Sequence, residues 1–471
     1  MTANSFLNKT PNAGNRRTYT ISVWVKRSVL GSNPIFTAYE SPFTSNSGEI
    51  LLHFDGDDTL HFRQWNGSAP YIILMITQRK FRDTTAWYHI VAAIDTTQST
   101  EANRVKIYIN GTQETGFSTS SYPSQNLETR FNDNIQHTIG TGEDVSRRYF
   151  DGQMAHFHFV DGTAYPASTF AETDSTTGVW KPKLGPSVTY GTNGFFLKFL
   201  NANSLGADSS GNSNDYSVNG NLKQSNSTPT NKFATFNPRG THVDYRTTVY
   251  QLHAGHTFWG TTGTTRCNSI DMCFQGGKWY WECKIEKANS TATMGVYCTD
   301  FSSPKRIEQF VGDISLQNQA NGGKRAVSYL ADSSSSKIQN GGSTVTYGAN
   351  ASDGDIIMMA FDSATGKNWF GINGTWNNAP GTSNVGNPAT GANDSGTPLV
   401  NTDNNLMSFY VGGRNSDSTN RYMYINFGHG FFGTTAVSSA NADGNGKGIF
   451  EYAPPSGFLA LCSENIQTDG G

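Results

Sequence analysis

The chain has 471 residues, of which 15% are charged and 12% are aromatic, and its formal net charge is −3 at pH 7. This negative balance argues against a nucleic-acid groove, which would show a basic stripe. No apolar run approaches the roughly 20 residues that a membrane span needs, and the N-terminus lacks the basic and apolar regions of a signal peptide. Many short apolar runs broken by Gly, Asn, Asp and Ser predict an all-β chain with many turns.

The first predicted strand covers residues 18–26, where every second residue from Tyr19 to Val25 is apolar. This period of two is typical of a strand with one buried face. A hairpin is predicted at 49–65, and an apolar strand follows at 71–76. The chain therefore begins with antiparallel strands joined by short turns.

The next pair of strands, 87–94 and 105–109, ends in Asn110-Gly111. These two residues predict a type I′ hairpin turn, because both central positions of that turn need a positive φ. The same order of an apolar strand, an Asp turn and Ile-Asn-Gly recurs at 355–374. We interpret the recurrence as two copies of one architecture, since the copies lie too far apart for a solenoid.

A strand at 149–159 ends the first copy. Taken in order, Trp24, the strand at 87–94, residues 107–111 and residues 150–159 resemble the laminin-G/concanavalin A-like sandwich family. The resemblance covers roughly residues 15 to 175 and implies a β-sandwich.

One segment departs from the order of that family. Residues 194–199 look like its opening strand but follow the other strands in this chain. We expect this segment to close the same sandwich in permuted order and to cover an otherwise open edge. The first domain is therefore predicted to be 1–230, with a Ser-, Asn- and Pro-containing linker at 224–230.

The second domain is predicted to be 231–471. Its strands at 277–285, 355–374 and 422–428 occur in an order that resembles a SPRY domain, which is itself a concanavalin-like sandwich. Two long polar insertions, 331–353 and 377–404, are predicted to be loops that carry recognition. The predicted fold class is thus all-β, with two concanavalin-like antiparallel β-sandwich (jelly-roll) domains in tandem.

A laminin-G-like unit followed by a SPRY-like unit, in a chain rich in Gly, Asn, Ser and Thr, resembles structural proteins of tailed bacteriophages, marine ones especially. This resemblance implies a non-enzymatic virion surface protein, a tail or head appendage made in the host cytoplasm. The leading hypothesis is recognition of host-surface glycan or protein. The alternatives are a purely structural capsid or tail decoration and, from another class, a glycan depolymerase. The implied partners are other virion proteins, host glycan and further copies of the chain, with no cofactor, nucleic acid or membrane insertion.

Aromatic side chains near predicted turns are the candidates for stacking on sugar rings, although aromatic residues also dominate protein cores. Four of them form the predicted ligand-binding set: Trp65, Tyr149, Trp376 and Tyr410. Tyr71 is a further candidate.

Three groups contain residue types that can bind metal ions, but no metal site is predicted from them. His156 and His158 share a strand face but lack a third ligand, so they are expected to face solvent. Two acidic loops could hold Ca²⁺. The first contains Asp55, Asp57 and Asp58, and the second contains Asp208, Asn212, Asn214 and Asp215.

No catalytic residue is predicted. Glycosidases need two carboxylates across a groove, and the paired glutamates of the concanavalin-like glycosidases are absent around Asp271. The five cysteines all lie in the second half, and an odd number does not fit a disulfide framework. Cys283 and Cys298 lie on predicted strands, where we expect core packing.

Overall fold

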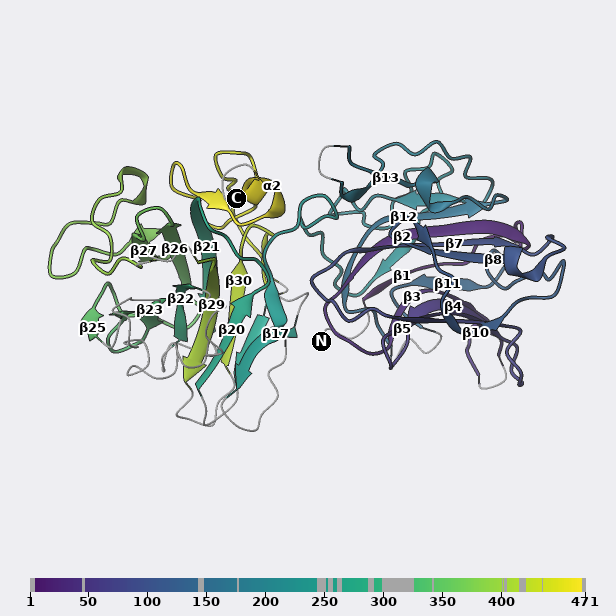
Figure 1. Cartoon of the computed structure of the whole chain (residues 1–471), viewed down its shortest axis with the longest axis horizontal. Helices are drawn as coiled ribbons and strands as arrows, with labels where there is room; N and C mark the ends of the chain where they lie inside the picture. The colour runs from purple at the N-terminus through teal and green to yellow at the C-terminus, as the bar shows by residue number, and fades with distance from the viewer. Residues whose placement is uncertain are drawn as a thin grey trace. The chain divides into compact units, whose positions relative to one another are not determined.

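The computed structural model divides the chain into two compact units, Met1–Gln224 and Ser225–Gly471 (Figure 1). The sequence places this boundary six residues later, at 230/231. The structure describes residues 5–44, 47–142, 148–175, 178–243, 251–252, 257–260, 265–286, 292–298, 326–340, 343–399, 401, 405–414, 421–433 and 435–467.

Unit 1 is a sandwich of two antiparallel sheets, which lie one above the other in Figure 1. The larger sheet has the order β10 (Phe117–Ser121), β6 (Ile73–Lys80), β5 (Thr59–Trp65), β4 (Glu49–Phe54), β3 (Asn33–Tyr39), β11 (Gln136–Ile139), β1 (Phe6–Lys9) and β16 (Ser217–Asn219). The smaller sheet has the order β15 (Phe195–Leu197), β12 (Gly152–Asp161), β2 (Thr18–Arg27), β7 (Tyr88–Asp95), β8 (Val105–Ile109) and β9 (Thr112–Gln113).

The core of unit 1 forms where the inward side chains of the two sheets meet. Ile21, Val23 and Val25 of β2 are fully buried there, as the alternation in the sequence predicts. The predicted strand at 71–76 instead begins at Ile73 and continues to Lys80, because Thr77 pairs with β10 and Lys80 pairs with β5. A short pair, β13 (Ala171–Thr173) and β14 (Trp180–Pro182), lies outside the two sheets.

Both Asn-Gly turns have the predicted geometry. Asn110 and Gly111 have φ values of 49° and 85°, and Asn373 and Gly374 have 48° and 85°. Both central residues of each turn therefore have the positive φ that a type I′ turn requires. A Cβ at Gly111 would lie 2.9 Å from the Trp180 ring, so this position also needs glycine for space.

The permuted strand closes the first sandwich, as predicted. In β15, Phe195 and Leu197 pair with β12 opposite Phe159 and Phe157. Phe195 and Leu197 point into the core, while Phe196 lies on the opposite face of the strand. The strand therefore covers the edge of β12 that would otherwise be open.

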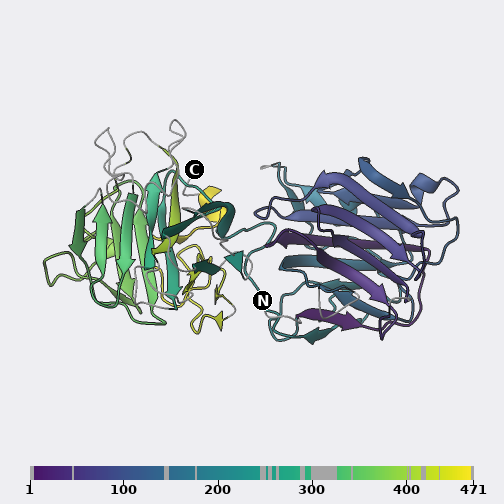
Figure 2. The same cartoon turned by 90° about the horizontal axis from the view of Figure 1, so that it is seen from below.

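Unit 2 is also built from two large sheets, whose strands lie side by side in Figure 2. One has the order β17 (Phe236–Val243), β20 (Thr265–Ile270), β29 (Met407–Arg414), β22 (Ala292–Cys298), β23 (Ala326–Ala331), β24 (Lys337–Asn340) and β25 (Ser343–Thr346). The other has the order β18 (Gln251–Leu252), β19 (Thr257–Gly260), β30 (Arg421–Asn426), β21 (Lys278–Ile285), β26 (Ile356–Asp362), β27 (Asn368–Ile372) and β28 (Thr375–Trp376). A short strand, β33 (Leu459–Ala460), runs parallel to β21, and β31 (Phe431–Phe432) pairs with β32 (Thr435–Ala436).

The prediction of a loop at 331–353 is wrong at 337–340 and 343–346, which form strands. Strands β24 and β25 lie inside it and extend the sheet from β23. Ile338 and Tyr347 are buried, and two such side chains in a polar segment are enough to hold an edge hairpin against the core.

Helix is confined to four short segments in the part of the chain that the structure describes. They are η1 (Glu101–Asn103), η2 (Ala167–Thr169), η4 (Pro388–Thr390) and α2 (Ser463–Asn465). None of these is long or apolar enough to cross a bilayer. The all-β prediction is confirmed, and Cys283 and Cys298 lie in the core of unit 2, as predicted.

Candidate functional site on the outer face of β4, β5 and β6

Strand β5 presents a row of polar and aromatic side chains on the outer face of the larger sheet of unit 1. Leu60 and Phe62 point into the core, and the alternate residues His61, Arg63 and Trp65 are half-buried on the other face. The alternation of a strand makes this row continuous.

At one end of the row, Trp65 and Tyr71 form an aromatic pair. Their ring centroids lie 4.9 Å apart at an angle of 55°, and both side chains are half-buried. The segment between them, 66–70, carries the exposed polar residues Asn66 and Ser68. Two tilted rings beside polar loop groups form a surface that can hold an apolar sugar face and its hydroxyls together.

Arg63 connects the aromatic pair to strand β4. Its Nη1 donates to the Tyr71 hydroxyl at 3.0 Å, and its Nη2 lies 2.9 Å from Glu49 Oε1. The guanidinium also lies 5.6 Å from the Tyr71 ring centroid. Arg63 and Glu49 side chains are 16% and 6% exposed, so both charges are held in fixed positions.

Arg130 borders the same end of the face. Its Nη1 donates to Glu40 Oε1 at 2.8 Å and its Nε to Asn66 Oδ1 at 3.2 Å. A Cβ at Gly48 would lie 2.1 Å from the Arg130 guanidinium carbon, so glycine is required for this approach. The bond to Asn66 ties the loop beside Trp65 to the rest of the sandwich.

At the other end of the row lie the acidic residues of the β4–β5 turn. Asp58 is not available to Ca²⁺, because its two carboxylate oxygens accept from Arg27 Nη2 at 3.0 Å and from Arg82 Nε at 3.1 Å. Burial opposes the ionised form of Asp58, but bonds from the Gly31 amide, Arg82 and Arg27 outweigh it and lower its pKa. A Ca²⁺ site that uses all three aspartates of this turn is therefore incomplete.

Asp57 and Asp55 remain on the open side of that turn. The Thr59 hydroxyl donates to Asp57 Oδ1 at 2.6 Å and lowers the pKa of Asp57. Asp55 Oδ2 lies 3.9 Å from His61 Nε2. Burial lowers the pKa of His61, against the charges of Asp55 and Asp57, so the imidazole is neutral at pH 7.

The second acidic loop forms a closed network instead of an ion site. Asp208 accepts from the Phe196 and Asn214 amides and from Ser210, and Asp215 accepts from the Asp208 amide. The side-chain amides of Asn212 and Asn214 both donate to Gly194 O. These oxygens hold the permuted strand in place, which explains the acidic composition of the loop.

His158 does not face solvent, and that expectation is wrong. It is 1% exposed because Phe196 stacks on it at 3.8 Å, and its Nδ1 lies 2.8 Å from the Tyr190 hydroxyl. His156 is half-buried at a bulge, with a φ of 47°. The pair packs the outside of the smaller sheet.

The predicted ligand-binding residues fall in different places. Trp65 and Tyr149 belong to unit 1, where Tyr149 is half-buried with its ring 6.5 Å from that of Phe6. Trp376 is half-buried against Tyr280, at 6.4 Å. Tyr410 is 0% exposed and its hydroxyl bonds to Ser328, so it is a core residue and not a surface residue.

The predicted recognition loop at 377–404 is described at 377–399 and at 401, and the other residues lie outside the described part. It is tied to β27, because Trp369 Nε1 donates to Ala392 O at 2.9 Å and the Ser395 hydroxyl donates to Asn368 Oδ1 at 2.6 Å. Its role in recognition stays a prediction.

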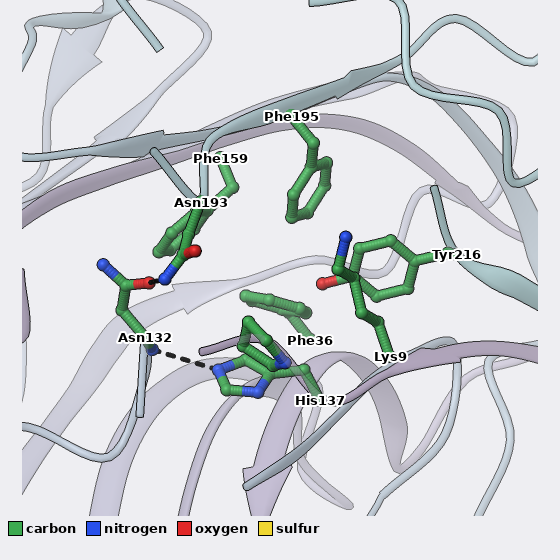
Figure 3. Close-up of a pocket in the computed structure, with 9 residues that line it drawn as sticks. Lys9, Phe36, Asn132, His137, Phe159, Asn193, Phe195 and Tyr216 are labelled. Carbon is green, nitrogen blue, oxygen red and sulfur yellow. Dashed lines mark hydrogen bonds between the residues drawn. The ribbon is translucent and has the colours of Figure 1, made fainter. Parts of the chain in front are cut away.

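A cavity between the two sheets of unit 1 is too small for a sugar. Its volume is about 10 Å³, which is room for one water molecule at most. Figure 3 shows Phe159 and Phe195 on one side and Phe36 and His137 on the other. The Asn132 amide donates to His137 Nε2 at 3.0 Å, so this ring is part of the core network.

Sequence reasoning missed Arg63, Glu49 and Arg130 on this face. The signal was available for Arg63, since it alternates with buried Leu60, Phe62 and Gln64 along β5. Glu49 and Arg130 could not be found in this way, because only strand pairing brings them to Arg63 and Asn66.

The comparisons with known proteins agree with this architecture. Residues 4–169 match the family model described as the Concanavalin A-like lectin/glucanases superfamily, of laminin-G type. Residues 4–169 are thus similar to a concanavalin-like lectin domain, and the chain has a concanavalin-like jelly-roll fold. A search of the curated proteins finds no match.

Solved structures with similarity include domain 4 of AbnA, a GH43 extracellular arabinanase from Geobacillus stearothermophilus, in complex with arabinotriose. It is 22% identical with a TM-score of 0.25, and the match covers 33% of this chain and 65% of that one, just under two thirds of its length. The native heptameric SAP-like pentraxin from Limulus polyphemus is 16% identical with a TM-score of 0.26, covering 38% and 86% of the two chains. The SPRY domain of human HERC1 is 16% identical with a TM-score of 0.26, covering 40% and 96%.

Proposed function

We propose that unit 1 is a carbohydrate-binding module and that its binding surface is the outer face of β5, centred on Trp65 and Tyr71. The observation that carries this proposal is the half-exposed aromatic pair, with rings 4.9 Å apart, inside the residues that match a lectin/glucanase family model. Arg63 holds the Tyr71 ring in place through its hydroxyl. A sugar ring placed on the pair would meet the polar groups of Asn66 and Ser68.

The proposed role is binding without catalysis. A glycosidase needs a carboxylic acid whose pKa is raised, to protonate the leaving group. On this face Asp57 has a lowered pKa, owing first to the hydrogen bond from Thr59. Glu49 Oε1 is held by Arg63 at 2.9 Å, so this oxygen is not free to reach a leaving group. Neither group fits the role of the acid.

The module is proposed to act on a virion surface, where it recognises host glycan. This step rests on the resemblance of the two-unit chain to structural proteins of tailed phages. Unit 2, with its ordered loop at 377–399, would attach the chain to other virion proteins or add a second recognition surface. A purely structural decoration protein is the alternative, and it requires no glycan binding.

Screening the full chain on a glycan array, followed by calorimetry with the best glycan, tests the proposal. Trp65→Ala should weaken binding at least tenfold, since truncating an aromatic anchor costs about 2 kcal/mol or more. Tyr71→Phe keeps the ring but removes the bond to Arg63, so it should have a smaller effect.

Tyr422→Ala is the matched control. Tyr422 and Tyr424 form a stacked pair in unit 2, with centroids 6.2 Å apart, so this variant removes an aromatic ring from outside the proposed surface. Binding that Trp65→Ala leaves unchanged would contradict the proposed surface. A chain that binds no glycan but is found in purified particles would favour the decoration role.

A further inference from the structure

The turn between β4 and β5 brings three metal-ligand groups together. Asp55, Asp57 and His61 each offer one ligand atom, and these atoms all lie within 4.8 Å of one another. Asp57 is exposed, and Asp55 and His61 are half-buried, so the group is open to solvent on one side. No other group of this kind is found among the described residues.

The backbone holds this turn in one conformation. The Asp55 amide donates to Thr59 O at 2.9 Å, and the Asp58 amide donates to Asp55 O at 3.0 Å. Asp58 has a φ of 70°, and the buried Arg27 anchors its carboxylate at 3.0 Å. The ligand groups are therefore placed before any ion binds, which lowers the entropy cost of binding.

His53 provides a second, independent observation. It lies directly opposite His61 in the strand register, on the same face of the sheet. Its side chain is 1% exposed, and neither ring nitrogen has a hydrogen-bond partner among the described residues. Its ring meets that of His61 edge to face, with centroids 5.1 Å apart. A buried polar group without a partner is costly, and this one lies beside the ligand group, where an ion and its bound water would supply a partner.

We propose that Asp55, Asp57 and His61 bind a divalent transition-metal ion and that Zn²⁺ fits the set best. Imidazole nitrogen and carboxylate oxygen are ordinary zinc ligands, whereas Ca²⁺ takes six or more oxygen ligands. Three protein ligands leave a fourth position of a tetrahedral ion for water. The site goes beyond the proposed glycan binding and does not rest on it, because His61 and Trp65 are roughly 13 Å apart along the strand.

Without an ion, Thr59 and Lys80 contact the ligand groups and compete with metal binding. The Thr59 hydroxyl lies 2.9 Å from His61 Nε2 and 2.6 Å from Asp57 Oδ1, so it bridges the two ligands. Lys80 Nζ lies 3.8 Å from Asp57 Oδ2. An ion would replace the bond between His61 and Thr59 and displace the ammonium group.

Titration calorimetry of the full chain with ZnSO₄, after treatment with a chelator, tests the site. We expect one Zn²⁺ per chain. His61→Ala and Asp57→Asn should each abolish its binding or weaken it at least tenfold, because losing even a hydrogen-bond partner of a ligand costs about 10–100-fold in metal affinity. Asp55→Asn keeps the size of the side chain and should weaken the same site, which guards against a folding defect in any one variant.

Asp83→Asn is the matched control. Asp83 accepts from the Thr85 amide and hydroxyl at 2.8 and 2.6 Å, the arrangement of Asp57 and Thr59, but it is not part of the group of ligands. This variant should bind Zn²⁺ as the wild type does. Wild-type stoichiometry in His61→Ala or no Zn²⁺ binding at all would overturn the proposal, as would displacement of Zn²⁺ by equimolar Ca²⁺. X-ray absorption of the zinc-loaded chain should show one imidazole and otherwise oxygen ligands.

Discussion

The two units share one architecture but differ in most of the ionisable groups that they bury, although unit 2 also buries a histidine, His429. Unit 1 buries histidines whose pKa burial lowers, to about 3 for His89, to about 4 for His137, and well below the usual value for His53 and His158. Unit 2 buries Glu282, whose pKa burial raises to about 7. The same sandwich can therefore respond to acid in opposite directions, depending on which group its polar positions hold.

The hydrogen bonds explain why each group is tolerated. Trp180 Nε1–H can only donate, so His89 Nδ1 must accept at 3.1 Å, and the ring is neutral. Glu282 accepts from the Tyr280 hydroxyl at 2.9 Å, from Asn426 at 3.1 Å and from the Glu451 and Tyr452 amides. The Glu451 and Tyr452 amides attach the C-terminal segment to β21, and all four donors offset part of the cost of burying the carboxylate.

The largest expected effect is that unit 1 loses stability at acidic pH. A buried histidine whose folded pKa is lowered does not change the free energy of unfolding above its unfolded pKa of 6.5. As the pH falls from 6.5 towards the folded pKa, this histidine lowers the free energy of unfolding. For His137 the loss at pH 5 is about 2 kcal/mol, and three further buried histidines act in the same direction. Urea unfolding at pH 8 and pH 5, with hydrogen exchange assigned to each unit, should show unit 1 weakened by several kcal/mol. Equal stability of unit 1 at both values would mean that these histidines are protonated in the folded state.

The second effect has the opposite sign and belongs to unit 2. Because the pKa of Glu282 is raised above its unfolded value of 4.5, its burial is least costly below pH 4.5 and becomes more costly as the pH rises through about 7. Its contribution should therefore favour unit 2 by about 3 kcal/mol at pH 4.5 relative to pH 8. The same unfolding measurement on Glu282→Gln should lack this dependence. A variant that keeps the wild-type slope between pH 4.5 and 7 would show that another group produces it.

The smallest expected effect is one in which the units should agree. Gly111→Val and Gly374→Val place a β-branched residue at a φ of 85° in equivalent turns. A Cβ at either position would also lie 2.9 Å from an aromatic ring, that of Trp180 or Tyr452. Each variant should lose about 1–3 kcal/mol in thermal or urea unfolding. A loss in one unit alone would show that the two turns are not equivalent in the folded chain.

Much of the fold could be predicted from local patterns. Alternation located β2 and β8, the hairpin pattern at 49–65 located β4 and β5, and Asn-Gly located both type I′ turns, because these signals lie within a few neighbouring residues. The hairpin β24–β25 was missed, since a polar edge strand with one buried Ile338 has too weak a pattern. Trp65 was chosen as an aromatic residue near a turn, and it lies half-buried beside Tyr71, so its role in binding stays a prediction. Tyr410 met the same criterion but is buried, because the sequence does not say which face of a strand is covered.

The sequence by itself determined the class of fold, the turns and the permuted strand, since each depends on residue types at short spacing or on a familiar order of strands. The tertiary structure decided which side chains share a surface. Arg63 reaches Glu49 and Tyr71, and His53 faces His61, only because β4, β5 and β6 pair in one register. The tertiary structure also pairs Asp58 with Arg27 and places Asp55 and Asp57 beside His61. Register and burial are set by contacts between distant residues, so they decide which acidic group stabilises the fold and which remains open to bind a ligand.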